Sequence, residues 1–331
     1  MIGKILGATV ALSMVSAMAT AAEYPEREVL GVVMWGAGGA TDTVARAVNP
    51  AAEAALGKPI VVLNKSGGAG AISTAYVNAA PADGYTFLYG AENPQLHGVM
   101  GVSKLDYNSF YPVNILGRGI GVIVVRADSK YKTMADLLAD VKANPGKIKM
   151  GGTGPGGLPN TIASLIGNSA PFDVNAIPFG GEGPGLTALQ GGEVAFMPAG
   201  ISAAAEHIKA GRLRALAVVN TSPVPQLPGA PAITDALPGM AKFLPWGPFY
   251  GVFVRKDTPD NVKAKLVAAF KTAAEDEGFK TLMTNRGNVV MNISGDEADA
   301  FLKQWQRVTV WVLHDTGATK VSPEDLGIAR P

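Results

Sequence analysis

Few side chains of this sequence could do chemistry, and the strongest candidate for a site is a glycine-rich turn. The apolar residues 32–35 lead into Gly36, Gly38 and Gly39, and residues 41–56 then have the pattern of a helix. Such a turn can bind an anion, because glycines let the backbone approach a ligand and the first N–H groups of a helix are unpaired. The same glycines could instead only permit a tight connection between strand and helix. The turn alone does not decide between these interpretations.

Two further turns of this kind follow, at residues 150–157 and 176–184. The first of them fits G-x-G-x-x-G after a strand, so a nucleotide-dependent enzyme is an alternative. That motif also requires an acidic residue at the end of the next strand, whereas Asp173 precedes the apolar residues there. Its fit to a dinucleotide site is therefore incomplete.

Nucleophilic and metal chemistry have little support in the sequence. There is no cysteine and no G-x-S-x-G motif, and the histidines are His97, His207 and His314. His97 follows the strand 86–90 and could line a cleft, whereas the other two lie in helical patterns. We expect no catalytic residue, no metal site and no cofactor.

Apolar stretches typical of strands alternate with helical patterns along most of the chain, which indicates an α/β fold. Two helix starts have the pattern of a capping box, at residues 133–136 and 294–297. Asp42 and Arg46 are spaced for an ion pair across one helical turn, an alternative to ligand contact by Asp42. A proline-rich stretch at residues 223–238 is typical of a surface loop crossing between lobes.

The N-terminus has the features of a cleaved secretory signal peptide over residues 1–22: Lys4, an apolar stretch and small residues before Glu23. The whole chain has 28 basic and 27 acidic residues, and Lys4 is the only charged residue of the signal peptide. The mature chain therefore has no net charge that would attract nucleic acid or an anionic membrane. We expect export to the periplasm, no nucleic-acid partner and a monomer.

Several separated motifs together resemble one family. They are the first glycine turn with its helix start, Gly67-Gly68-Ala69-Gly70, Ala82-Asp83-Gly84-Tyr85-Thr86, residues 209–217, Gly191-Gly192-Glu193-Val194 and Trp246-Gly247-Pro248. The sequence is similar over almost the whole mature chain to the Bug family, the TctC-like extracytoplasmic receptors of tripartite tricarboxylate transporters.

The resemblance implies a periplasmic-binding-protein fold with a ligand cleft between two mostly parallel α/β lobes. Lobe 1 would comprise residues 23–123 and 248–331, and lobe 2, inserted in it, residues 124–247. Family members hold a carboxylate largely through the backbone amides of the first two glycine loops. Two departures stand out: Gly36-Ala37 replaces the usual prolines, and residues 158–161 lack the usual serines and histidine.

The resemblance predicts a receptor that captures a small carboxylate, performs no chemistry and delivers the ligand to membrane permease subunits. The alternative is a periplasmic enzyme that uses the cleft on a small carboxylate or a nucleotide-like ligand. Glu92 and Glu182 add acid near an anion-binding cleft, which leaves open an amino-bearing or hydroxylated carboxylate. The residues expected to bind the ligand are Trp35, Gly36, Gly38, Gly39, Thr41, Asp42, Asn93, Thr153, Gly156, Gly157, Asn160, Phe179, Gly180 and Glu182.

Overall fold

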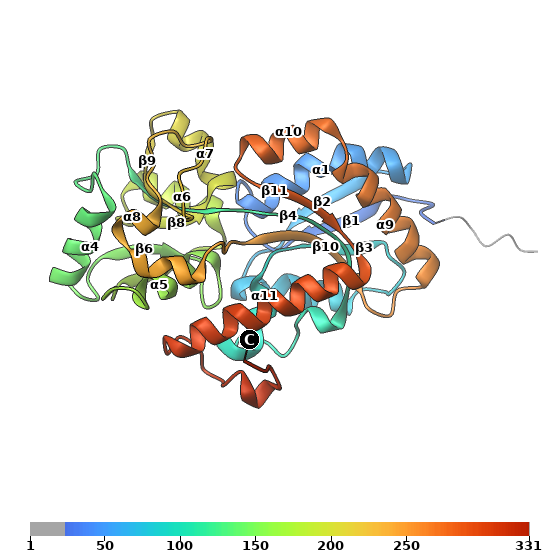
Figure 1. Cartoon of the computed structure of the whole chain (residues 1–331). Helices are drawn as coiled ribbons and strands as arrows, with labels where there is room; N and C mark the ends of the chain where they lie inside the picture. The colour runs from blue at the N-terminus through green and yellow to red at the C-terminus, as the bar shows by residue number, and fades with distance from the viewer. Residues whose placement is uncertain (1–23, 331) are drawn as a thin grey trace, which may run out of the picture.

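A six-stranded sheet organises one half of the structure, a computed structural model that describes residues 24–330 (Figure 1). The strand order is β11-β4-β10-β3-β1-β2. The first three strands of the chain are parallel, and β10 and β11 run antiparallel to their neighbours. The strands are β1 (Val29–Val33), β2 (Ile60–Asn64), β3 (Thr86–Gly90), β4 (Phe110–Arg118), β10 (Phe249–Arg255) and β11 (Val289–Ile293).

Alternating side chains of this sheet pack against helices on both faces, because successive residues of a strand point to opposite sides. Phe87 and Tyr89 of β3 lie in one apolar cluster with α1 and α9, and Leu88 lies in another with α2 and α11. The helices of this half are α1 (Ala40–Leu56), α2 (Ala71–Ala79), α3 (His97–Met100), α9 (Asp260–Ala274), α10 (Glu277–Asn285) and α11 (Gly295–Asp315), with short 3-10 turns η1 (Gly68–Gly70), η2 (Asn93–Leu96), η3 (Tyr107–Ser109) and η5 (Glu324–Leu326).

The other half contains two smaller sheets surrounded by helices (Figure 1). The three-stranded sheet has the order β8-β5-β9 and is antiparallel, and β6 and β7 form a parallel pair. The elements are β5 (Gly121–Arg126), α4 (Met134–Ala143), β6 (Lys149–Gly152), α5 (Leu158–Gly167), β7 (Asn175–Pro178), α6 (Glu182–Gly191), β8 (Met197–Gly200), α7 (Ile201–Lys209), β9 (Leu213–Val219), α8 (Ile233–Ala236) and η4 (Pro238–Phe243).

The α/β lobes are as expected, but the expectation that the strands within each lobe are mostly parallel is wrong. The ladders β1–β2, β1–β3 and β6–β7 are parallel, whereas those of β10, β11 and β5 are antiparallel. The alternation of strands and helices predicted parallel crossovers throughout. However, β4 and β10 are long strands that leave or enter the larger half, and such returning strands pair antiparallel with their neighbours.

The chain crosses between the halves at two adjacent places. β4 ends at Arg118 and β5 begins at Gly121, while the return segment passes through Gly247 just before β10. The two segments touch, because the Gly119 N–H donates to the Pro248 carbonyl at 2.7 Å. The first lobe boundary expected from the sequence, after residue 123, falls inside β5, and the second, before residue 248, lies just before β10.

Replacing Gly247 by alanine is expected to lower the free energy of unfolding by about 1–3 kcal/mol, the usual cost of overpacking. A Cβ at this position would lie 2.1 Å from the carbonyl oxygen of Gly119, so the crossing segments must move apart. Urea unfolding followed by tryptophan fluorescence measures the effect. Gly167→Ala is the matched control, because a Cβ there meets nothing within 4 Å. Equal midpoints for Gly247→Ala and the control would contradict this account of the crossing.

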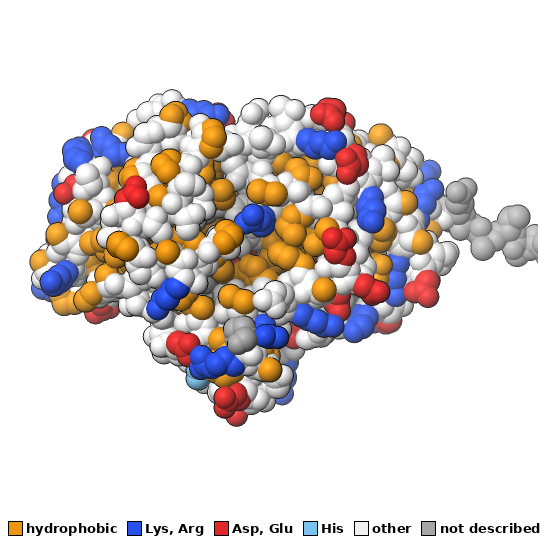
Figure 2. Space-filling model, viewed as in Figure 1, with side chains coloured by type: hydrophobic (Ala, Val, Ile, Leu, Met, Phe, Trp, Pro, Cys, Tyr) orange, Lys and Arg blue, Asp and Glu red, His pale blue; other side chains and the backbone are white. Residues whose placement is uncertain are grey.

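The surface carries charges of both signs on each half, as the face in Figure 2 shows. This mixture agrees with the nearly balanced numbers of basic and acidic residues in the sequence. Among the described residues, no helix is long and apolar enough to cross a membrane.

Candidate ligand-binding site

A small cavity lies where the two halves meet. Its volume is about 10 Å³, which is room for about one water molecule. Its lining side chains come from the ends of strands and the starts of helices in both halves: Trp35, Thr41, Ala91, Glu92, Thr153, Leu158, Glu182, Pro248 and Tyr250. The cavity is therefore formed only when the halves are together.

The first glycine loop packs directly against the third. The Gly36 N–H donates to the Gly180 carbonyl at 2.9 Å. A Cβ at Gly183 would lie 2.1 Å from the carbonyl oxygen of Ala37, so that position has no room for a side chain. Gly38 has φ +78°, a conformation that favours glycine. The glycines of the first and third loops thus permit close backbone contact between the halves, a role that the sequence alone does not indicate.

Glu182 places a carboxylate on the helix start that the sequence predicts as an anion site. Its Oε2 accepts from the Ala40 N–H at 3.3 Å, and its Oε1 accepts from the Gly200 N–H. Ala40 begins α1 in one half, and Gly200 caps α7 in the other. The residue as a whole is partly exposed, but burial of its carboxyl group raises the pKa, against the opposing effect of the two backbone bonds. The protein itself therefore supplies an anion at this position.

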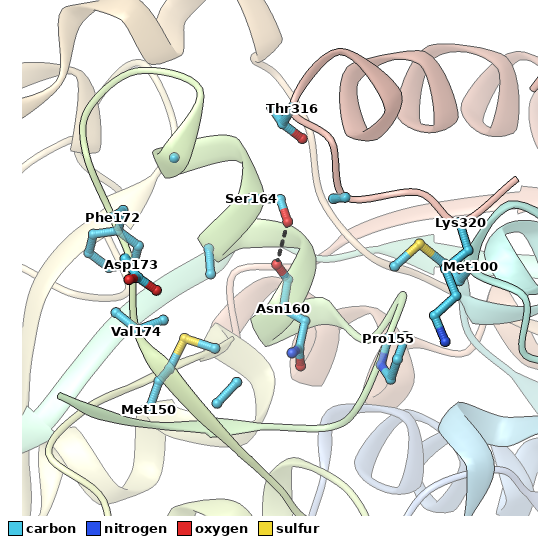
Figure 3. A pocket seen from close by; sticks show the side chains of 14 residues that line it. Met100, Met150, Pro155, Asn160, Ser164, Phe172, Asp173, Val174, Thr316 and Lys320 are labelled. Carbon is cyan, nitrogen blue, oxygen red and sulfur yellow. Dashed lines mark hydrogen bonds between the residues drawn. The ribbon is translucent and has the colours of Figure 1, made fainter. Parts of the chain in front are cut away.

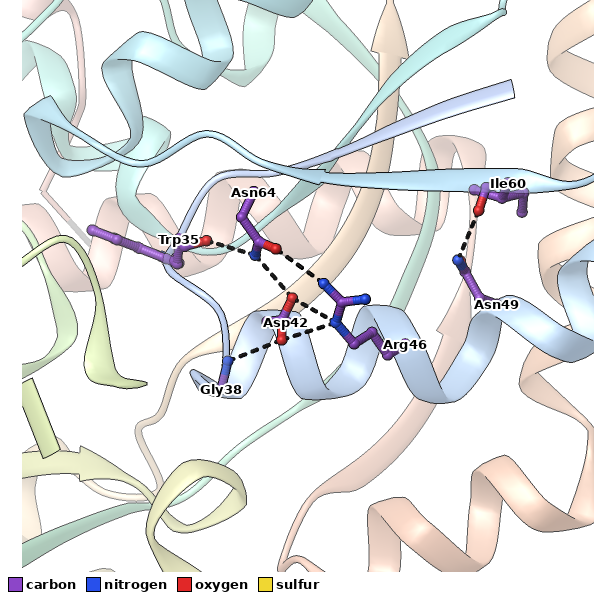
Figure 4. A network of polar contacts seen from close by, with 7 residues as sticks. All are labelled: Trp35, Gly38, Asp42, Arg46, Asn49, Ile60 and Asn64. Carbon is purple, nitrogen blue, oxygen red and sulfur yellow. Dashed lines mark hydrogen bonds and ion pairs between the residues drawn. The ribbon is translucent and has the colours of Figure 1, made fainter. Parts of the chain in front are cut away.

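Asp42 lies in a polar network beside the first loop rather than in the cavity lining (Figure 4). Its carboxylate accepts from the Gly38 N–H at 3.0 Å, from Arg46 Nε at 3.0 Å and from Asn64 Nδ2 at 2.8 Å. Asn64 Nδ2 also donates to the Trp35 carbonyl at 2.9 Å. The ion pair across one helical turn is confirmed, and the network fixes the loop that carries Trp35.

The second glycine loop is held from both sides. Thr153 N–H donates to Asn160 Oδ1 at 3.1 Å, which ties the loop to α5. Asn93, at the start of η2 in the other half, donates through Nδ2 to the Gly156 carbonyl. Gly157 caps α5. Of these residues, only Thr153 lines the cavity, and its Oγ1 has no hydrogen-bond partner among the described residues.

A larger groove lies on the other side of α5 (Figure 3). Asn160 and Pro155 line it together with Lys320 near the C-terminus. Ser164 Oγ donates to the Asn160 carbonyl at 3.1 Å. None of the residues of the first glycine loop lines this groove, and of the third loop only Ala176 does. The small cavity, which is lined by residues of all three loops, is therefore the better candidate for a binding site.

Four predicted residues line the cavity, namely Trp35, Thr41, Thr153 and Glu182. The other predicted residues lie around the cavity, in loops or in the first turns of α1, η2 and α5: Gly36, Gly38, Gly39, Asp42, Asn93, Gly156, Gly157, Asn160, Phe179 and Gly180. Phe179 is half-buried, and its N–H donates to the Gly152 carbonyl at 2.8 Å.

The remaining lining residues, Ala91, Glu92, Leu158, Pro248 and Tyr250, are not among the predicted ligand-binding residues. Glu92 was nevertheless expected near the cleft, because it follows the carboxyl end of β3, where open α/β sheets place ligand contacts. Tyr250 comes from a distant part of the chain and has no comparable local signal.

Besides Thr153, two buried side chains of the cavity, Glu92 and Tyr250, have an oxygen without a hydrogen-bond partner among the described residues. Glu92 is 2% exposed, and its Oε2 has no hydrogen-bond partner in the described part of the chain. Burial raises the pKa of Glu92 to about 8, with a smaller contribution from the nearby charge of Glu182. The hydroxyl of Tyr250 is also unpartnered, and burial raises its pKa well above the usual value. Buried polar groups without a partner are rare in proteins, and raised pKa values of buried groups in a cavity mark it as a candidate functional site.

The histidines are engaged elsewhere. His97 Nε2 lies 2.9 Å from the Ala69 carbonyl, and burial lowers the pKa of its ring. His207 contacts Arg212, and His314 contacts Thr319. None of the three lines the cavity. Within residues 24–330 no group of three or more His, Cys, Asp or Glu could hold a metal ion.

The two halves and the cavity between them define the class of two-lobed solute-binding proteins. Solved structures support this assignment. The periplasmic binding protein BugD superposes with a TM-score of 0.84 at 29% identity, covering 89% of this chain and 99% of that one. MatC from Rhodopseudomonas palustris, solved with bound malate, has a TM-score of 0.78 at 26% identity over 86% of this chain and all of its own. The expected α/β, two-lobed fold is confirmed.

The sequence comparison identifies the family. Residues 44–311 match the tripartite tricarboxylate transporter family receptor, TctC. The protein BugT of Bordetella pertussis is 27% identical over 318 residues, which are 95% of this chain and 97% of that protein. The chain belongs to the TctC family of solute-binding receptors, as its resemblance to the Bug proteins implied.

Proposed function

We propose that this protein is a periplasmic receptor that captures a small carboxylate between its two halves, at the site of the small cavity, and delivers it to the permease subunits of a tripartite tricarboxylate-type transporter. The observation that carries the proposal is the cavity itself, which is lined from both halves and contains unpartnered polar groups. The malate bound in MatC supports a small carboxylate as ligand.

The first turns of two helices contribute to holding the carboxylate. Thr41 lies in the first turn of α1 and Leu158 in that of α5, and both line the cavity. N–H groups at helix starts favour an anion, although at α1 the Ala40 N–H already donates to Glu182. Trp35 and Thr153 complete this side of the cavity, and the other predicted loop residues support it. Because residues of both lobe 1 and lobe 2 line the cavity, we expect binding of the ligand and closure of the lobes to occur together.

The proposal includes export. The signal peptide expected at residues 1–22 lies outside the described residues, as does its cleavage site before Glu23. A periplasmic address agrees with the family of binding proteins to which the chain belongs. Mass spectrometry of the protein recovered from the periplasm should find an N-terminus near Glu23.

A thermal-shift screen over mono-, di- and tricarboxylates is expected to find at least one that raises the melting temperature. A ligand that binds only the folded state, present at 100 times its Kd, adds about 2.7 kcal/mol. Small-angle scattering with that ligand should then show a smaller radius of gyration than the free protein. Recovery of the ligand unchanged after incubation separates a receptor from an enzyme. A screen with no stabilising carboxylate, or a ligand that is consumed, would overturn the proposal.

A further inference from the structure

Three helices begin around the carboxylate of Glu182. Glu182 is the first residue of α6, and its two oxygens accept from the N–H groups of Ala40, the first residue of α1, and of Gly200, just before α7. The three helices are preceded by Gly39, Gly181 and Gly200, so none of them has a capping side chain of its own. The carboxylate of Glu182 therefore serves as a shared cap for α1 and α7.

The first turns of α1 and α6 face each other from opposite halves. A Cβ at Gly39 would lie 3.6 Å from the Gly183 nitrogen, and a Cβ at Gly200 would lie 3.3 Å from that of Ala40. Each helix start carries a partial positive charge, so this contact is unfavourable unless a negative charge lies beside it. The carboxylate of Glu182 provides that charge from within the chain. Glu182 therefore favours the arrangement in which the halves touch.

The carboxylate of Glu182 also occupies the position at which the carboxylate of a ligand would meet α1. The cavity beside it, lined by Glu182 and Thr41 among others, has a volume of about 10 Å³, room for about one water molecule. A carboxylate group is larger than a water molecule and carries the same charge as Glu182. Among the described residues, no lysine or arginine lines the cavity to offset two such charges. A ligand that binds the Ala40 N–H must therefore move Glu182 away from it.

We propose that Glu182 is an internal competitor of the ligand: its carboxylate holds part of the free protein closed, and the carboxylate of a ligand must displace it from the start of α1. The second part of this inference rests on the proposed function, whereas closure by Glu182 concerns the free protein alone. Glu182 therefore lowers the affinity for a carboxylate and sets the fraction of the free protein that is closed.

The radius of gyration of the free protein tests the role in closure. Glu182→Gln keeps the shape of the side chain and removes its charge. An amide has one acceptor oxygen, so its NH2 group must face an N–H donor, that of Ala40 or that of Gly200. The free variant is therefore expected to open, with a larger radius than the free parent in small-angle scattering. Glu193→Gln is the matched control with the radius of the parent, because Glu193 is exposed and lies outside the cavity.

Calorimetric titration tests the competition. The probe is whichever of propionate, succinate, malate and citrate raises the melting temperature most. Glu182→Gln is expected to bind this probe at least about 10-fold more tightly than the parent, because a charged hydrogen bond no longer has to be broken. Saturating probe should bring both proteins to the same radius, so the decrease on binding is larger in the variant. Replacing a side chain that only held the fold or contacted the ligand would weaken binding instead.

Ala40→Pro removes the same contact from the other side, and it keeps the inference testable if Glu182→Gln does not fold. Proline suits the first residue of a helix, where its missing N–H is not needed within the helix. Gly39, which precedes it, has φ −76° and ψ 172°, the extended conformation that a following proline favours. The free variant should open like Glu182→Gln. It should not bind the probe more tightly, because the probe also loses this N–H.

The outcomes separate this inference from the proposed function. A free Glu182→Gln protein with the radius of the parent overturns the role of Glu182 in closure. Unchanged or weaker binding of the probe by Glu182→Gln overturns the competition and leaves the receptor function standing. Failure of every carboxylate to bind overturns the proposed function and the competition with it, whereas the radius of the free variants still decides whether Glu182 closes the protein.

Discussion

Replacing Gly183 by alanine is expected to weaken ligand binding by about 10-fold to 100-fold without unfolding either half. The added Cβ would lie 2.1 Å from the Ala37 carbonyl oxygen and 3.0 Å from two backbone atoms of Gly38 and Gly39. Gly183 belongs to α6 and Ala37 to the first loop, so this clash arises only where the halves meet. Overpacking costs about 1–3 kcal/mol, and each 1.4 kcal/mol corresponds to about 10-fold in affinity.

The variant should therefore populate an arrangement with the halves apart, in which the clash is absent. Calorimetry with the carboxylate found in the screen measures the affinity, and small-angle scattering measures closure. The melting temperature without ligand should stay near that of the parent. Gly191→Ala is the matched control in the same helix, because its Cβ would lie 4.0 Å from the nearest atom. Parent-like affinity and compaction in Gly183→Ala would show that the two loops do not have to touch.

The α/β class and the position of the loops could be predicted because they depend on local patterns. Each glycine turn follows an apolar strand and precedes a helix, and these relations hold in the structure. The capping box at residues 133–136 is confirmed, with Thr133 and Asp136 bonded to each other's backbone N–H. That at residues 294–297 is wrong, since Ser294 makes no capping bond and its Oγ accepts from Asn114 at 3.3 Å instead.

The composition of the cavity could not be predicted, because it depends on contacts between distant segments. The glycines of the first loop indicated an anion site, but the structure places the carboxylate of Glu182 at that helix start. Gly183 gives no sign in the sequence that it faces Ala37. The mostly apolar residues 115–125 contain no local sign that β4 ends at Arg118 and that β5, in another sheet, begins at Gly121. These features depend on packing between segments that are far apart in the chain, and local sequence patterns do not predict such packing.

The stability of the unliganded protein is expected to fall as the pH rises from about 5 to about 8, and Glu92 is the main cause. Burial raises the pKa of Glu92 from 4.5 to about 8, so the folded chain holds this proton more tightly than the unfolded chain. The resulting stabilisation is complete below the unfolded pKa and is lost as the pH passes through the folded one. At about 1.4 kcal/mol per pKa unit, the loss is on the order of 4–5 kcal/mol.

Other groups contribute to the same pH range, so the measurement compares the parent with Glu92→Gln. The raised pKa of Glu182 acts in the same direction, whereas the lowered pKa of His97 reduces stability as the pH falls below about 6.5. Both effects remain in Glu92→Gln and cancel in the difference. Urea unfolding should find the two proteins similar at pH 5 and the variant more stable by several kcal/mol at pH 8.5. A difference that stays constant from pH 5 to pH 9 would mean that Glu92 does not hold its proton in the folded chain, because its ionisation would then be the same in both states.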